Sequence, residues 1–199
     1  MGRWPTGERT VSYLLERSRL EPLGEADLAS AADTALVRAA KRLRTAVGAL
    51  EGGDVDGAYV AAYDAYRMAA EALLLRQGLR ATGGDGSHMT VEDAVGAQFS
   101  ELIPGFAKPT FERFRKTRHT AQYFDPSDPP LEEADVQWAL EVSQAAVDGT
   151  EGVLESARLD RFDGYHQDHP SEGRKAGRDH AGRCQENAYH HRPRQLDFR

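Results

Sequence analysis

One stretch of the sequence gathers side chains that could hold a phosphate and move a proton. Within residues 111–123, Arg115, His119 and Tyr123 follow one another at intervals of four. A regular helix places this cation, imidazole and phenol in one polar row. A guanidinium binds phosphate through paired hydrogen bonds, and an imidazole exchanges its proton near neutral pH. A solvated basic face without chemistry is the other interpretation, and the residues alone leave both open.

The same stretch also carries an apolar row. Phe111, Phe114, Arg118 and Ala121 share one helical face, which the two phenylalanines mark as the face toward the core. Arg118 is therefore expected to be partly buried. A buried guanidinium needs a partner, so we expect a carboxylate or a backbone carbonyl beside it.

The elements that position this helix are predicted to be helices, because the sequence has almost no strand pattern. Apolar residues at steps of three and four predict long helices over residues 28–50 and 55–78, and the short joint Gly52-Gly53 makes them an antiparallel hairpin. Further helices are expected over residues 11–17, 91–102, 109–123 and 131–157. The predicted fold class is all-α, an up-and-down bundle of four to six helices.

Particular residues are expected to face the core or to start helices. The first long helix is expected to bury the row Leu36, Ala40, Leu43, Val47 and Leu50. The aromatic residues with helical spacing are interpreted as core and dimer contacts rather than as a platform for bases: Tyr59, Tyr63, Tyr66 and Trp138. Thr90 with Asp93 resembles a capping box, which starts the third core helix at Val91.

The glycine-rich segment Gly83–His88 is expected to be a loop before a helix N-terminus. Backbone N–H groups at such a place can hold a phosphate, although the segment lacks the lysine of a P-loop. A plain connector is the alternative interpretation.

The charge is unevenly distributed along the chain. The 199 residues carry a formal net charge of −7, and residues 1–157 hold 16 basic and 25 acidic side chains. An acidic body disfavours non-specific binding to DNA. A local basic cluster nevertheless stands before His119, formed by Arg113, Arg115, Lys116 and Arg118.

Composition sets further expectations about class and location. No apolar run approaches ~20 residues, so no transmembrane helix is expected. The single cysteine, Cys184, rules out a disulfide framework, and a cytoplasmic location is predicted. Beyond Leu159 aliphatic residues almost vanish, which predicts a disordered, His- and Arg-rich tail over residues 158–199. The sequence predicts no cofactor and no metal site, since the tail histidines lack ligand spacing.

Two strings indicate a family. AAYDAYRMAAEALLLRQGL and FRKTRHTAQYFDPSDPPLEEADVQWALEVSQAAV resemble a HEPN domain, over about residues 28–157, after an N-terminal helix and linker over residues 1–27. The resemblance implies an all-α bundle that is usually a homodimer. It also implies an RNA-, nucleotide- or partner-binding module, often of a toxin–antitoxin or defence system, whose partner can be a minimal nucleotidyltransferase. The alternative is a metal-independent endoribonuclease.

The family signature, an Arg followed after four to six residues by a His, fits one pair in this chain, and a string of other branches of the family offers a second frame. Arg113 and His119 have five residues between them, although a regular helix sets them about 240° apart. In this frame the resemblance implies that His119 transfers the proton and that arginine holds the scissile phosphate. In the second frame, which resembles other branches of the family, Arg118 takes the arginine position and Tyr123 that of the histidine. Arg115 and Lys116 are the expected additional phosphate-binding residues.

Overall fold

The computed structural model describes residues 6–24, 27–83, 86–123, 126–156 and 159–162. Contacts divide the chain into residues 1–166 and 167–199, and every described residue lies in the first unit. The tail predicted beyond residue 162 lies outside the described residues. The helices of the first unit are α1 (Glu8–Glu16), α2 (Leu28–Glu51), α3 (Val55–Arg76), α4 (Ser87–Phe99), α5 (Lys108–Gln122) and α6 (Glu133–Glu155), with a 3-10 turn at Pro104–Phe106. The all-α prediction is confirmed.

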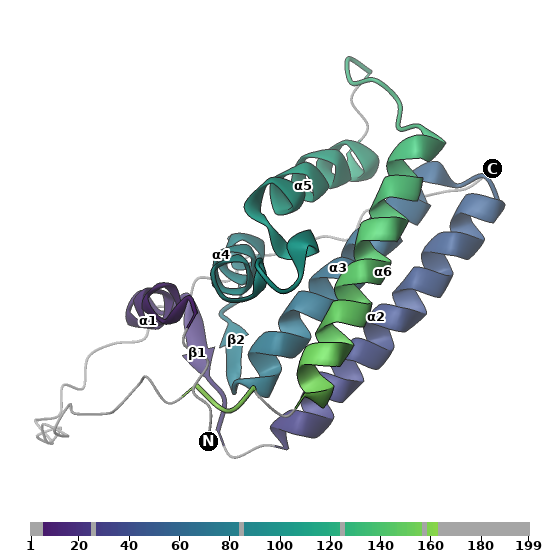
Figure 1. Ribbon diagram of the computed structural model, residues 1–199. Helices are drawn as coiled ribbons and strands as arrows, with labels where there is room; N and C mark the ends of the chain where they lie inside the picture. Colours follow the sequence, from purple (N-terminus) through teal and green to yellow (C-terminus); the bar gives the residue numbers. More distant parts are fainter. Residues whose placement is uncertain (1–5, 25–26, 84–85, 124–125, 157–158, 163–199) are drawn as a thin grey trace, which may run out of the picture. The chain divides into compact units, whose positions relative to one another are not determined.

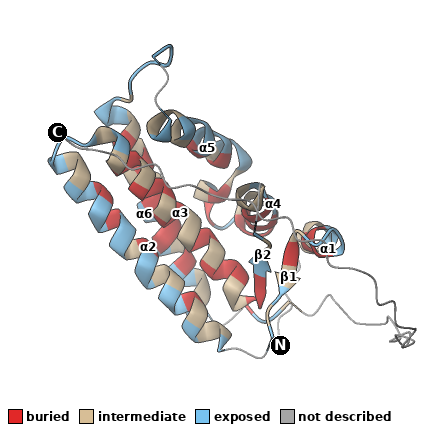
Figure 2. Cartoon of the chain, turned by 180° about the vertical axis from the view of Figure 1, so that it is seen from behind, coloured by how far each residue is buried: buried red, intermediate tan, exposed pale blue. Residues whose placement is uncertain are grey.

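Helix α3 is the centre of this fold. It forms an antiparallel hairpin with α2, and α6 packs along it, while α4 and α5 cross on another side (Figure 1). The hairpin begins its second helix where expected, because the Asp54 carboxylate accepts a hydrogen bond from the backbone N–H of Gly57. Twelve residues of α3 are buried, and most of them are alanine or tyrosine. Figure 2 shows α3 largely buried and the outer side of α2 exposed.

An aromatic cluster fixes α5 against α3. The Tyr66 ring stacks on Phe114 with centroids 4.4 Å apart and meets Phe111 edge-on at 5.0 Å. The Tyr66 hydroxyl also donates a 2.7 Å hydrogen bond to the carbonyl of Gly105, just before α5. Tyr59, Tyr63 and Tyr66 are all buried, so their assignment to the core is confirmed, and Trp138 is half-buried.

The buried face of α2 differs from the expected one. The buried residues are Ala32, Ala39, Leu43 and Ala46, while Val37 and Val47 are exposed. The alanine side chains let α2 approach the alanine-rich α3 closely, which larger side chains at those positions would prevent. Of the expected row, Leu43 is buried and Leu36 and Leu50 are half-buried against the core, whereas Val47 is exposed.

The start of α4 is also corrected. The helix begins at Ser87, with Gly86 as its N-cap at a φ of 95°, a backbone conformation that suits glycine. Thr90 is consequently buried inside the helix, where its hydroxyl donates to the Gly86 carbonyl at 3.2 Å. The capping box predicted at Thr90 is wrong.

Two short segments add contacts that the sequence pattern did not indicate. Strands β1 (Leu20–Pro22) and β2 (Leu79–Ala81) pair antiparallel, with Leu20 opposite Ala81. Residues 159–162, assigned from the sequence to the tail, pack on the bundle. Leu159 is buried, and the backbone N–H of Phe162 donates to the carbonyl of Gln77 at 2.9 Å.

Candidate functional site

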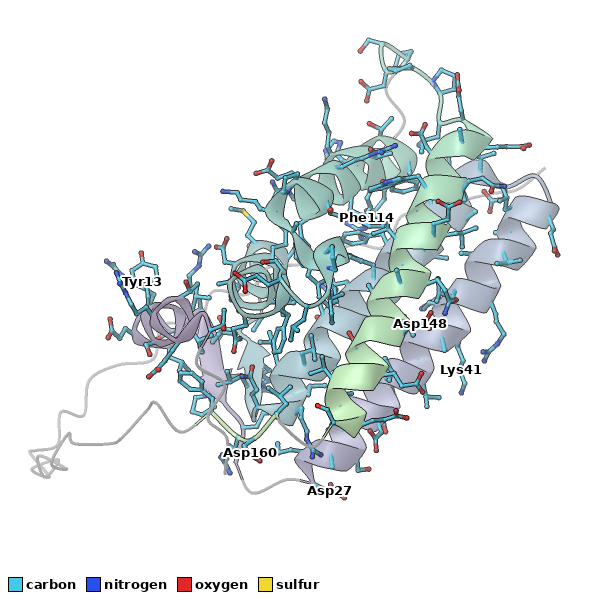
Figure 3. The ribbon with its side chains drawn as sticks, viewed as in Figure 1. Tyr13, Asp27, Lys41, Phe114, Asp148 and Asp160 are labelled. Carbon is cyan, nitrogen blue, oxygen red and sulfur yellow. The ribbon has the colours of Figure 1, made fainter. Side chains whose placement is uncertain are left out.

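Helix α5 carries the predicted site residues, and its apolar row decides which of them reach solvent. Phe111 and Phe114 are buried, and Figure 3 shows Phe114 between α5 and α6. The helix is continuous from Lys108 to Gln122, so no kink brings Arg113 toward His119. Within one chain the two residues of the first frame lie on different sides of the helix.

Arg113 is held by α6. Its guanidinium carbon lies 3.7 Å from the ring centroid of Trp138, and one of its terminal nitrogens lies 3.3 Å from a carboxylate oxygen of Asp135. A guanidinium over an indole face is attracted by the ring, and the ion pair adds to that attraction. These contacts give Arg113 a structural role that the sequence did not indicate.

The polar row predicted on α5 is exposed. The rings of His119 and Tyr123 lie 4.9 Å apart, and Lys116 is exposed beside them. Arg115 pairs with Glu92 of α4, with a nitrogen–oxygen distance of 2.8 Å. Burial raises the pKa of Glu92, and the charge of Arg115 opposes that shift.

Arg118 faces inward from α5, and its half-buried position confirms the helical-wheel prediction. Its guanidinium carbon lies 5.0 Å from the ring centroid of Tyr63 on α3. The prediction of a carboxylate or carbonyl partner for Arg118 is wrong, because the Arg118 Nε is buried without a hydrogen-bond partner among the described residues. The contact with the Tyr63 ring takes the place of that partner.

His88 is the site residue that the sequence analysis missed. Its Nδ1 lies 2.8 Å from the Tyr63 hydroxyl, and an Arg67 nitrogen lies 3.3 Å from each ring nitrogen. Burial lowers the pKa of His88, and the charges of Arg67 and Arg118 lower it further, while Asp64 opposes them. His88 is the second residue of α4, whereas the sequence predicted that Gly83–His88 is a loop. A helix start at Ser87 was the signal that could have indicated a fixed position for this histidine.

Tyr63 connects these groups and remains a neutral phenol. Burial raises the pKa of Tyr63 to about 12. When His88 is neutral and its Nδ1 carries no proton, the Tyr63 hydroxyl donates the hydrogen bond to Nδ1. Helices α3, α4 and α5 thus bring together Arg67, His88 and Arg118 around one tyrosine, a group we call the inner cluster.

A cavity of about 320 Å³ adjoins the inner cluster. Arg67 and Ser87 line it, together with Gly83 from the segment considered for phosphate binding. Among the described residues, no three acidic, histidine or cysteine side chains gather in a way that could hold a metal ion. No helix in the same part of the chain is long and apolar enough to cross a membrane.

Helices α2, α3, the arginine-rich α5 and α6 are the elements expected from the family resemblance, and the comparison with family models supports it. The HEPN domain model matches residues 32–153, which is more than half of the chain. The chain belongs to the HEPN domain family. None of the curated proteins and none of the solved structures matches it significantly.

Proposed function

We propose that this HEPN domain binds single-stranded RNA through the exposed polar row of α5. The observation that supports the proposal is the difference in pairing along this helix. Arg113 and Arg115 pair with carboxylates, whereas Lys116 and His119 have no ion-pair partner within the described ranges. Lys116 is therefore free to pair with phosphate, and the His119 and Tyr123 rings offer a surface for a base.

A binding experiment tests the proposal. Lys116→Ala and His119→Ala are compared with Lys41→Ala, a matched control at an exposed position of α2. Binding of a labelled single-stranded RNA is measured by fluorescence anisotropy at several salt concentrations. Lys116→Ala is expected to weaken binding and to reduce the salt slope by about 0.7, the value for one lost contact to a single strand. Equal affinities for wild type and all three variants would contradict the proposal.

Metal-independent endoribonuclease activity is the second candidate, and the exposure of His119 supports it. Among the described residues no side-chain contact joins His119 to Arg113 or Arg118, so a catalytic pair would require residues from a second copy. In such a homodimer His119 would take the proton of the ribose 2′-hydroxyl as its oxygen attacks phosphorus, and the 5′-oxygen would leave and be protonated. Incubation with labelled RNA in EDTA tests this, and a 2′,3′-cyclic phosphate end that disappears in His119→Ala supports it.

A homodimer and a nucleotidyltransferase-type partner belong to the proposal as well. Because two-fold pairing is the commonest way to bring two identical rows together, we expect light scattering to report twice the 21.9 kDa mass. Growth arrest on expression, relieved by a co-expressed nucleotidyltransferase, would support a toxin–antitoxin setting. A monomer at tens of micromolar would argue against the endoribonuclease in particular.

A further inference from the structure

The inner cluster brings three cationic or proton-binding side chains together from three helices. Arg67 of α3 lies 3.3 Å from the His88 ring nitrogens of α4. Arg118 of α5 lies on the ring of Tyr63, whose hydroxyl bonds to His88. These residues are far apart in the sequence, so only the packing of α4 and α5 on α3 creates the cluster.

The pairing of these charges is incomplete. Arg67 forms an ion pair with Glu71 at 2.9 Å, and Glu92 of α4 pairs with Arg115 through one carboxylate oxygen, while its other oxygen is buried without a hydrogen-bond partner among the described residues. Arg118 has no ion pair among the residues described, and its Nε is buried without a hydrogen-bond partner. Leaving a buried donor without a partner costs free energy, so a purely structural arginine would be expected to have one.

The adjoining cavity offers room for a ligand. Its volume of about 320 Å³ is at the lower end of the range of small-molecule sites, roughly 300–1,000 Å³. The walls combine Arg67, Glu71 and Arg80 with the apolar side chains of Leu74, Leu75 and Leu79. Glu71 pairs with Arg67 and Glu21 pairs with Arg80, so this cavity suits the organic substituent of a ligand, and Arg67 joins it to the inner cluster.

We propose that the inner cluster is a binding site for a phosphate monoester, with the phosphate held by Arg67, His88 and Arg118 and the organic substituent in the leucine-lined cavity. A monoester fits better than a phosphodiester within a chain, because a half-buried site admits a terminal group more readily than a continuous strand. The phosphate can belong to a small phosphorylated molecule or to the 5′ end of an RNA. The site is separate from the exposed row of α5 and does not depend on it.

Binding of a dianion is coupled to protonation of His88. Burial and two cations keep the pKa of His88 low in the free protein, and a dianion beside the ring favours the imidazolium. Affinity for a fully ionised anion such as sulfate is therefore expected to rise as the pH falls from 8 to 6. The charged and titratable groups on the surrounding elements are Tyr63, Asp64, Arg67 and Glu71 on α3, Arg80 on β2, Glu92 on α4, and Arg115 and Arg118 on α5.

Binding of simple anions to the full chain tests the proposal. Phenyl phosphate, diphenyl phosphate and sulfate are titrated by calorimetry against chloride at matched ionic strength. Phenyl phosphate is expected to bind and diphenyl phosphate to bind at least tenfold more weakly. Arg67→Gln and Arg118→Gln are each expected to weaken binding by about tenfold or more, since each loses a charge-assisted hydrogen bond. Arg42→Gln, at an exposed position of α2, is the matched control and is expected to bind like wild type.

A second measurement follows the unmodified chain and does not depend on the folding of the two arginine variants. The ring signals of His88, assigned by comparison with His88→Asn, are followed by NMR during a sulfate titration. They are expected to shift and to report a higher pKa with sulfate bound. Unchanged His88 signals, or equal phenyl phosphate affinity in wild type and both arginine variants, would overturn the proposal.

Two RNA probes separate the sources of the phosphate and keep this site distinct from the α5 row. Tighter binding of a 5′-phosphorylated RNA than of its 5′-hydroxyl form, lost in Arg118→Gln, would identify an RNA end. Equal binding of the two RNAs, together with binding of phenyl phosphate, would identify a small molecule. Equal binding of the RNAs without binding of phenyl phosphate would overturn the inner site while leaving RNA binding by α5 intact.

Discussion

Replacing Arg113 by alanine is the change that best separates a structural from a catalytic role on α5. The structure places the Arg113 guanidinium 3.7 Å from the Trp138 ring centroid and 3.3 Å from Asp135, with 47% of its side chain exposed. An exposed cation–π contact contributes ~0.5–1 kcal/mol, and an exposed ion pair ~0.2–1 kcal/mol. Since the aliphatic part of Arg113 also covers the indole, Arg113→Ala is expected to lower the free energy of unfolding by about 1–2 kcal/mol.

Thermal melting followed by circular dichroism measures this effect. For a chain of this size each kcal/mol shifts the melting temperature by about 2–4 °C, so Arg113→Ala should melt about 2–8 °C below wild type. Arg113→Lys keeps the charge near Asp135 but loses the planar contact with Trp138, so its melting temperature should lie between those of Arg113→Ala and wild type. Lys116→Ala, on the exposed side of the same helix, is the control and should melt within about 1 °C of wild type.

A double-mutant cycle assigns the effect to the ring. In a Trp138→Leu background, Arg113→Ala should cost about 0.5–1 kcal/mol less than in wild type, because the cation–π contact is already absent. The reasoning is refuted if Arg113→Ala melts like wild type and at the same time abolishes RNA cleavage. That result would make Arg113 the phosphate-binding arginine of the family signature.

Three further predictions follow from contacts of the bundle. Tyr66→Phe removes the hydrogen bond to the Gly105 carbonyl and leaves that acceptor without its partner, so it should lower stability by about 1–2 kcal/mol in urea unfolding; a smaller change than 0.5 kcal/mol would mean that water replaces the hydroxyl. A chain ending at residue 162 should melt like the full chain, whereas one ending at residue 158 should lose about 2 kcal/mol with the buried Leu159, and equal melting of the two would contradict the packing of residues 159–162. The pKa of His88 lies below its ordinary 6.5 in the folded chain, so the unfolded chain binds more protons at this residue, and the contribution of His88 to stability should decrease as the pH falls through 6.5. The difference in unfolding free energy between wild type and His88→Asn should therefore change between pH 7 and pH 5. A difference that stays constant over this range would contradict the prediction.

The helices could be predicted from the sequence because their signals are local. Steps of three and four between apolar residues act within one or two turns, as does the Asp54 cap, and the structure places helices α2, α3, α5 and α6 accordingly. The helical wheel of α5 also predicted that Arg118 is partly buried, apart from the polar row that holds His119, and the structure has Arg118 half-buried and His119 exposed. Periodicity within one helix was sufficient to predict these positions.

Other features required the neighbouring helices. The face of α2 that is buried depends on how closely α3 approaches, and the approach of two alanine-rich surfaces selected Ala39 and Ala46 over Val47. Helix α4 starts at Ser87, before Thr90, because Gly86 adopts a left-handed conformation that only the folded chain reveals.

The candidate site also has some features that local spacing sets and others that the packing of helices sets. The exposed row of α5 follows from spacing within thirteen residues, so the sequence alone determined its membership. The partners of the arginines did not follow from spacing: Arg113 meets Trp138, Arg118 meets Tyr63, and His88 joins Arg67 only in the packed bundle. Each of these contacts joins side chains from different helices. Their distances are set by the way the helices cross, which depends on the whole core and on no single stretch of sequence.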